Sequence, residues 1–209
     1  MDNIRRKRIR TVVSTLNKAR RKQNQKIDLM CNDILAAHND FINKLQSFRF
    51  AADFYENLLG TSSLNEVAET AGEFFTSNIP DTNVVIVFAE NANSQLHFYG
   101  SNPRLEDIPA ALNDSLTGEL TVQVCRSNKI CRSELLCQLG FTASPMIMKQ
   151  ISIAAIPLSS TSDARGMMVL YRHGENKLRD EELKKAASVM PGLAKAIRAC
   201  KNPADMASM

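Results

Sequence analysis

The first 59 residues contain neither glycine nor proline, and Gly60 and Pro80 are the first residues of each kind. Nothing in this stretch has to interrupt a helix, because these two residues are the strongest helix breakers. A stripe with alternating steps of four and three residues runs along it, and nine of its twelve positions are apolar. The twelve are Ile9, Val13, Leu16, Arg20, Gln23, Ile27, Met30, Ile34, Ala37, Phe41, Lys44 and Phe48. The sequence therefore predicts a coiled-coil segment over residues 1–59, with a polar break at Arg20 and Gln23.

A helix of this length needs a partner for its apolar stripe. At 1.5 Å per residue it would extend roughly 84 Å from residue 4 to residue 59, more than a body of about 150 residues can cover. The simplest partner is a second copy of the chain. The expected dimer seam then consists of Ile9, Val13, Leu16, Ile27, Met30, Ile34, Phe41 and Phe48. The alternative is a helical hairpin that bends near residues 20–25 and buries the stripe within one chain.

Charge is distributed unevenly along the chain. The first 49 residues hold 12 of the 26 Lys and Arg residues but only 4 of the 22 Asp and Glu residues. A basic arm of this kind suits a nucleic acid, an anionic membrane surface or an acidic partner, although it can also be a solvated helix face. Its arginines are Arg5, Arg6, Arg8, Arg10, Arg20 and Arg21. The basic residues overlap the heptads instead of preceding them, which argues against the zipper type of DNA reader.

Composition indicates a folded protein without a membrane span. Hydrophobic residues make up 44% of the chain, too many for a disordered segment. The longest apolar run, residues 84–89, is far shorter than a bilayer-crossing helix. Five cysteines are an odd number in a chain large enough to fold without disulfides, which favours reduced thiols. We therefore expect a cytoplasmic location.

Residues 60–200 have the pattern of a small α+β domain, and residues 201–209 of a disordered tail. Ser63 and Glu66 form the spacing of a capping box before a helix over residues 64–75. A single short helix is expected over residues 116–128, and a helix that starts at Asp180 should kink at Pro191. Residues 101–109 have the composition of a loop, and residues 133–149 favour no single structure. Strands are expected at residues 84–89, 96–100, 129–132, 151–158 and 166–172.

This order of elements resembles the GAF domain family. The resemblance covers residues 60–200 and rests on LNEVAETAGEFF, NVVIVFAE, LTGELTVQVCRSNKICRSE, ISIAAIPLSSTSDARGMMVLYR and LRDEELKKAASVM. The chain is also similar to a bacterial GAF-like family with an N-terminal helical region and no assigned chemistry. The resemblance implies a central antiparallel sheet flanked by helices, a pocket between the sheet and variable loops, and a parallel association of the first and last helices. GAF domains bind diverse ligands, so the cofactor stays unknown.

Specific ligand signatures of the family are missing. The cyclic-nucleotide pattern is absent, and none of the three histidines stands beside a cysteine as bilin attachment requires. His97 alternates with Leu96 and Phe98 in a predicted strand. An ordinary surface histidine is a simpler interpretation of this position than a haem ligand. An apolar pocket is expected instead, with walls formed by Phe88, Phe98, Cys131, Leu136, Leu139, Phe141, Met148 and Met168.

Cys125, Cys131 and Cys137 are separated by five residues each. Zinc and iron–sulfur sites usually begin with a closer pair, so the spacing favours small apolar core residues over a metal site or a redox centre. We expect a non-enzymatic GAF-like sensory or scaffold protein that dimerises through its N-terminal helix and acts on a separate output partner. The alternatives are a cysteine-based redox sensor or GAF-type reductase and a nucleic-acid-associated protein.

Overall fold

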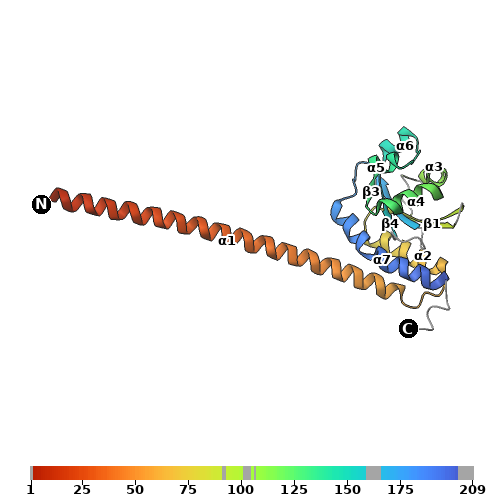
Figure 1. Ribbon diagram of the computed structural model, residues 1–209, viewed down its shortest axis with the longest axis horizontal. Helices are drawn as coiled ribbons and strands as arrows, with labels where there is room; N and C mark the ends of the chain where they lie inside the picture. Colours follow the sequence, from red (N-terminus) through yellow and green to blue (C-terminus); the bar gives the residue numbers. More distant parts are fainter. Residues whose placement is uncertain (1, 91–92, 101–104, 106, 159–165, 202–209) are drawn as a thin grey trace. The chain divides into compact units, whose positions relative to one another are not determined.

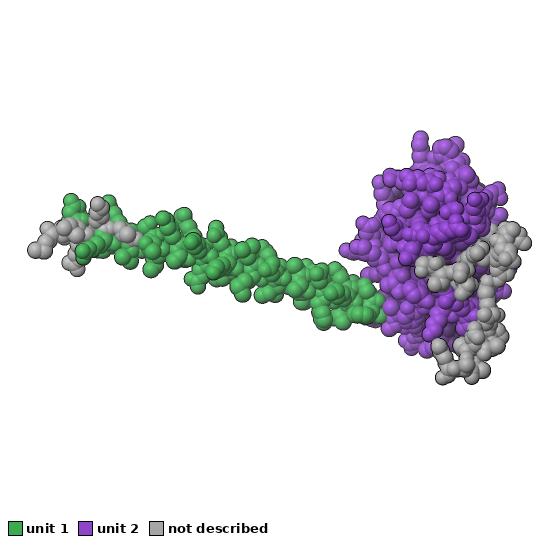
Figure 2. Space-filling model, viewed as in Figure 1, with its two compact units in different colours: residues 1–48 green, residues 49–209 purple. Residues whose placement is uncertain are grey.

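The computed structural model describes residues 2–90, 93–100, 105, 107–158 and 166–201. It divides into two compact units, residues 1–48 and residues 49–209 (Figure 2). The expected polar turn at residues 159–163 and the expected tail beyond residue 201 lie outside the described residues. Within the described part, no helix has both the length and the apolar character that crossing a bilayer requires.

Unit 1 consists of helix α1 alone, and α1 (Asp2–Leu58) continues into unit 2. The long N-terminal helix is thereby confirmed, and the hairpin alternative is wrong because the helix passes through residues 20–25 without interruption (Figure 1). Helical residues there keep their backbone hydrogen bonds, since no proline or glycine removes them. A single helix has no second element within its unit to pack against. All eight seam residues are exposed, from Val13 at 51% to Phe48 at 72%.

The centre of unit 2 is a five-stranded antiparallel sheet with the order β2-β1-β5-β4-β3. Its strands are β1 (Asn83–Glu90), β2 (Asn93–Tyr99), β3 (Cys131–Arg132), β4 (Ile151–Pro157) and β5 (Gly166–His173). β-Branched residues such as Val84 and Ile86 are buried along β1 because they pack well on a pleated surface. The predicted α+β fold with a central antiparallel sheet is confirmed.

Helices cover both faces of the sheet (Figure 1). On one face, α2 (Leu64–Asn78) and α7 (Asp180–Lys201) pack against each other and against alternate strand residues such as Ile86 and Ile156. On the other face, a second core cluster contains strand residues such as Val85 and Val169. The helices that contribute to it are α3 (Ile108–Ser115), α4 (Gly118–Ser127), α5 (Ser133–Gln138) and α6 (Pro145–Gln150).

Helix starts follow local capping chemistry. The predicted capping box is confirmed: the Ser63 hydroxyl accepts from the Glu66 N–H, and the Glu66 carboxylate accepts from the Ser63 N–H. The single short helix expected over residues 116–128 is present as α4, which begins after Thr117, whose side chain accepts from the Leu120 N–H. The loop expected over residues 101–109 is too long, since α3 starts at Ile108 with a proline in its first turn.

The last turns of α1 belong to unit 2, whereas the sequence placed a boundary between residues 59 and 60. Phe54 is fully buried, and its ring lies edge-on to Phe74 of α2 with centroids 5.1 Å apart. Phe50 makes a similar edge contact with Phe74 at 5.0 Å. Aromatic burial of this kind holds the end of α1 on the domain core, so the division falls inside the helix.

Candidate functional site

The eight residues expected to line a GAF-type pocket lie on two different faces of the sheet. Cys131, Leu136 and Phe141 are buried in the cluster beneath α3, α4 and α5, and three further candidates pack against the same cluster: Phe98, Leu139 and Met148. Phe88 and Met168, by contrast, are buried in the cluster beneath α2 and α7. Neighbouring residues of a strand point to opposite faces, so a set chosen by residue type alone was divided between the two cores.

The three cysteines of unit 2 that were considered as a redox or metal site, Cys125, Cys131 and Cys137, do not form one reactive cluster. Cys131 is fully buried, with its Sγ 3.3 Å from the Ser127 Oγ, and Cys125 Sγ lies 3.2 Å from the Gly166 carbonyl oxygen. Cys137 is exposed. Burial raises the pKa of the Cys131 thiol, which the Ser127 hydrogen bond only partly offsets. A raised pKa disfavours the thiolate that nucleophilic and redox chemistry require. Among the described residues, no three acidic, cysteine or histidine side chains gather as metal ligands would.

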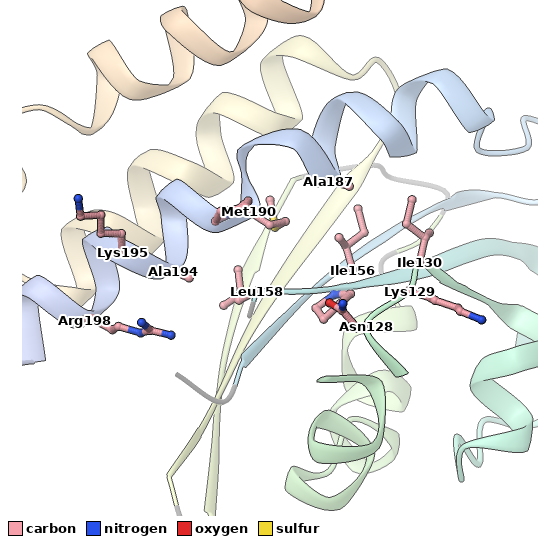
Figure 3. A pocket seen from close by; sticks show the side chains of 12 residues that line it. Asn128, Lys129, Ile130, Ile156, Leu158, Ala187, Met190, Ala194, Lys195 and Arg198 are labelled. Carbon is pink, nitrogen blue, oxygen red and sulfur yellow. The ribbon is translucent and has the colours of Figure 1, made fainter. Parts of the chain in front are cut away.

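A groove of about 600 Å³ opens beside α7, at the edge of the sheet where β3 pairs with only two residues of β4. Three segments line it: residues 128–130 before β3, residues 156–158 at the end of β4, and α7 (Figure 3). Its apolar residues include Ile130, Ile156, Leu158 and Met190. A volume of this size is in the range of small-molecule sites.

Polar groups lie at both sides of this groove. Figure 3 shows the Arg198 guanidinium and the Asn128 side chain directed toward the groove from opposite sides, while Lys129 and Lys195 extend away from its middle. Asn128 has a left-handed backbone (φ 49°) because it ends α4, a conformation that asparagine tolerates. Three cationic residues and no acidic residue are among the described residues that line the groove. Positive charge therefore predominates among the described residues of this lining.

Pro191 gives the wall of the groove an unusual backbone. It lies inside α7, which continues to Lys201, and both Pro191 and Ala187 line the groove. Proline has no N–H, so the Ala187 carbonyl lacks the donor that the fourth following residue supplies elsewhere in a helix. The sequence predicted a kink at Pro191, but not that this proline would lie at a groove.

The groove is close to the contact between α7 and α1. Gly192 follows Pro191, and a Cβ atom at this glycine would lie 2.1 Å from the Tyr55 Cε1 of α1. Only a residue without a side chain allows the Tyr55 ring to approach the α7 backbone so closely. The Tyr55 ring of α1 thus lies directly against this part of α7.

The beginning of α7 is fixed by ion pairs. The Arg172 guanidinium, 2% exposed, donates to the Glu182 carboxylate at 2.7 Å, and Arg132 pairs with Asp180. Burial raises the pKa of Glu182, but hydrogen bonds from the Arg179 N–H and from the Arg172 and Arg179 side chains outweigh it and hold this pKa below its ordinary value of 4.5. The start of α7 is thus anchored, while its later turns lie along the groove.

None of the eight sequence candidates lines the groove. Its residues are far apart in the sequence, and hydrophobic periodicity assigns Ile156, Leu158 and Met190 to the core. One sequence signal did point to the place: a proline within a helix of otherwise strong helix formers, because such a residue needs a structural or functional reason.

Comparison with known proteins shows the fold. No family model and no curated protein matches the sequence. Three similar solved structures are GAF domains. The one from the phosphoenolpyruvate-protein phosphotransferase of Coxiella burnetii has a TM-score of 0.56 and 13% identity, over 78% of this chain and 98% of that one. The corresponding Acinetobacter domain has a TM-score of 0.54 and 12% identity, over 77% and 98% of the two chains.

The third structure is a GAF domain/HD domain protein from Geobacter sulfurreducens, with a TM-score of 0.50 and 12% identity, over 68% of this chain and 97% of that one. The chain therefore has a GAF-like fold, preceded by a long helix. This fold agrees with the resemblance in the sequence.

Proposed function

We propose that this protein is a non-enzymatic sensor that binds an amphipathic organic anion in the groove beside α7. The observation that carries the proposal is the groove itself, with apolar residues between Arg198 and Asn128. An apolar ligand body would bury surface against the partly exposed Ile130 and Ala187, and a carboxylate would accept charge-assisted hydrogen bonds from Arg198. A GAF-like fold supports a sensory role without choosing the ligand.

The signal passes through α7 to α1. A bound ligand displaces the turns of α7 around Pro191, and the close contact of Gly192 with Tyr55 transfers this change to the end of α1. We propose that α1 forms a homodimer through its exposed seam and presents the changed arrangement to a separate output protein. The exposure of all eight seam residues supports this proposal.

Isothermal titration with decanoate, and with decanol as the uncharged control, tests the site. Decanoate should bind more tightly than decanol. Arg198→Gln should weaken decanoate binding roughly tenfold to a hundredfold, since hydrogen bonds to charged groups contribute about 1.5–3 kcal/mol, and should leave decanol binding unchanged. Lys195→Gln should have a smaller effect, and Lys185→Gln, which removes a charge from the same helix outside the groove, should have none.

Two results would contradict this site. Equal decanoate affinity in the Arg198 variant and the parent protein would exclude the groove as the anion site. Binding to phosphatidylglycerol vesicles without binding to monomeric decanoate would show that the surface recognises a membrane and not a free ligand.

Sedimentation of the full chain tests the dimer separately. We expect a homodimer at micromolar concentration, and Ile27→Asp should shift it to monomer because a charge in the seam is costly to bury. Asp28→Asn, which changes the neighbouring residue outside the seam, is the matched control. A monomeric parent protein would refute the dimer.

A further inference from the structure

We infer that two copies of α1 pair in antiparallel orientation, and this inference rests on the proposed homodimer. The resemblance to GAF domains implies a parallel association instead. The choice between the two follows from the charged residues that interrupt the seam, because their neighbours across the dimer differ between the two orientations.

The stripe on α1 assigns each seam residue to one of two core positions of a heptad. The first position (a) holds Val13, Arg20, Ile27, Ile34, Phe41 and Phe48, and the second (d) holds Ile9, Leu16, Gln23, Met30, Ala37 and Lys44. All twelve residues are exposed on α1, so the whole stripe is available to a partner.

A parallel dimer in register brings like charges together. Each core residue then faces its own copy, so Arg20 faces Arg20 and Lys44 faces Lys44. The flanking positions around Arg20 hold no carboxylate that would neutralise the pair: they are Asn17, Ala19, Asn24 and Lys26. Two desolvated guanidinium groups without a counter-charge are strongly unfavourable.

An antiparallel dimer removes both conflicts, because position a then packs against position d of the other helix. With Ile27 aligned to Met30, the sum of the two residue numbers is 57 in every layer. Arg20 therefore faces Ala37, and Lys44 faces Val13. The remaining layers pair Ile34 with Gln23, Phe41 with Leu16 and Phe48 with Ile9.

The same alignment also provides counter-charges. The residue directly before each position a is called position g, and in an antiparallel pair the g residues of the two helices face one another. This places Lys26 opposite Asp33 of the partner subunit and brings Asp40 of the partner subunit beside the Arg20 layer. The two-fold axis repeats each contact, so four ion pairs form. The uneven charge of α1 is thus complementary to a second copy in the reversed direction.

Disulfide trapping distinguishes the orientations. In a background with the exposed Cys31 and Cys137 replaced by serine, we would compare Val13→Cys, Lys44→Cys and the double variant under mild oxidation. The antiparallel dimer predicts covalent dimers only for the double variant. Covalent dimers in both single variants would show a parallel coil and overturn the inference. Persistent dimers without trapping in any variant would overturn the alignment.

A charge swap provides an independent readout. Lys26→Asp and Asp33→Lys should each weaken the dimer roughly tenfold, as two exposed ion pairs are lost and replaced by like charges. The double variant Lys26→Asp/Asp33→Lys should restore the affinity, because both changes meet across the interface. Lack of restoration would contradict the inference, whereas a parent protein that sediments as a monomer would refute the proposed dimer itself.

Discussion

Because Gly192 has no side chain, α7 and the end of α1 can lie in close contact. Its backbone lies against the Tyr55 ring, and the preceding Pro191 leaves the Ala187 carbonyl without its usual helical donor. At the point where α7 meets both the groove and α1, the helix therefore lacks one side chain, at Gly192, and one backbone hydrogen bond, at Pro191.

Replacing Gly192 by alanine should destabilise unit 2. The new methyl group would overlap the Tyr55 ring, which is 41% exposed and has to rotate away from α7. Overpacking costs about 1–3 kcal/mol, and the higher helix propensity of alanine offsets about 1 kcal/mol of this cost. Urea unfolding measures the change. The double variant Gly192→Ala/Tyr55→Ala should recover part of the loss, because the truncated side chain makes room. A loss that is the same with and without Tyr55 would show that the ring is not the obstacle.

Arg172 and Glu182 should make stability depend on acidity. The pKa of Glu182 is below 4.5 in the folded protein, so its contribution is complete above pH 4.5 and is lost as the pH falls through the folded-state value. Arg172→Met should lower the free energy of unfolding by about 1–3 kcal/mol, since the Glu182 carboxylate loses one of its partners and keeps only its contacts with Arg179. Unfolding followed at pH 7 and pH 3 should show a smaller difference between variant and parent at pH 3. An equal difference at both pH values would contradict the assignment.

At the scale of elements, the start of α2 provides a measurable cap. Ser63→Ala removes the hydroxyl that accepts from the Glu66 N–H and should cost about 1 kcal/mol. Thermal unfolding measures this loss. Ser188→Ala is the control, because the hydroxyl of the exposed Ser188 donates to the Lys185 carbonyl inside α7 and caps no helix end. Equal effects of the two substitutions would argue against a capping role.

Sequence reasoning was most successful where one element carries its own signal. The β-branched run of β1 and the capping box of α2 are local, and both are present. Helix α3 was missed because Pro109 suggested a loop, although proline is well suited to the first turn of a helix. The groove was missed because β4, α7 and residues 128–130 meet only through the fold.

On the scale of the whole molecule, charge separates the helix from the domain. The chain as a whole carries a net charge of +4, but the basic residues concentrate in the first 49 residues. A polyanion should therefore be attracted to α1, with an affinity that falls steeply as salt rises.

Replacing Arg6, Arg8 and Arg10 by glutamine should reduce binding to a mixed-sequence single-stranded oligonucleotide and flatten the salt dependence of that binding. With fewer cationic side chains on its phosphates, the oligonucleotide releases fewer counterions when it binds. All three side chains are exposed on α1. Fluorescence anisotropy at several salt concentrations measures both quantities. Replacing Lys184, Lys185 and Lys195 instead is a control of equal charge. If both triple variants lost binding equally, the attraction would be due to net charge and not to the arm.

The short pairing of β3 has a consequence for self-association of the sheet. Among the described residues, only Ala154 and Ala155 of β4 are paired on that side, so the rest of this edge resembles a template for a foreign strand. Leu158 donates to Gly166 of β5, which makes the preceding residue, Pro157, the one whose backbone faces outward. Proline offers no N–H to an incoming strand. Pro157 therefore protects this end of β4 against the addition of a foreign strand.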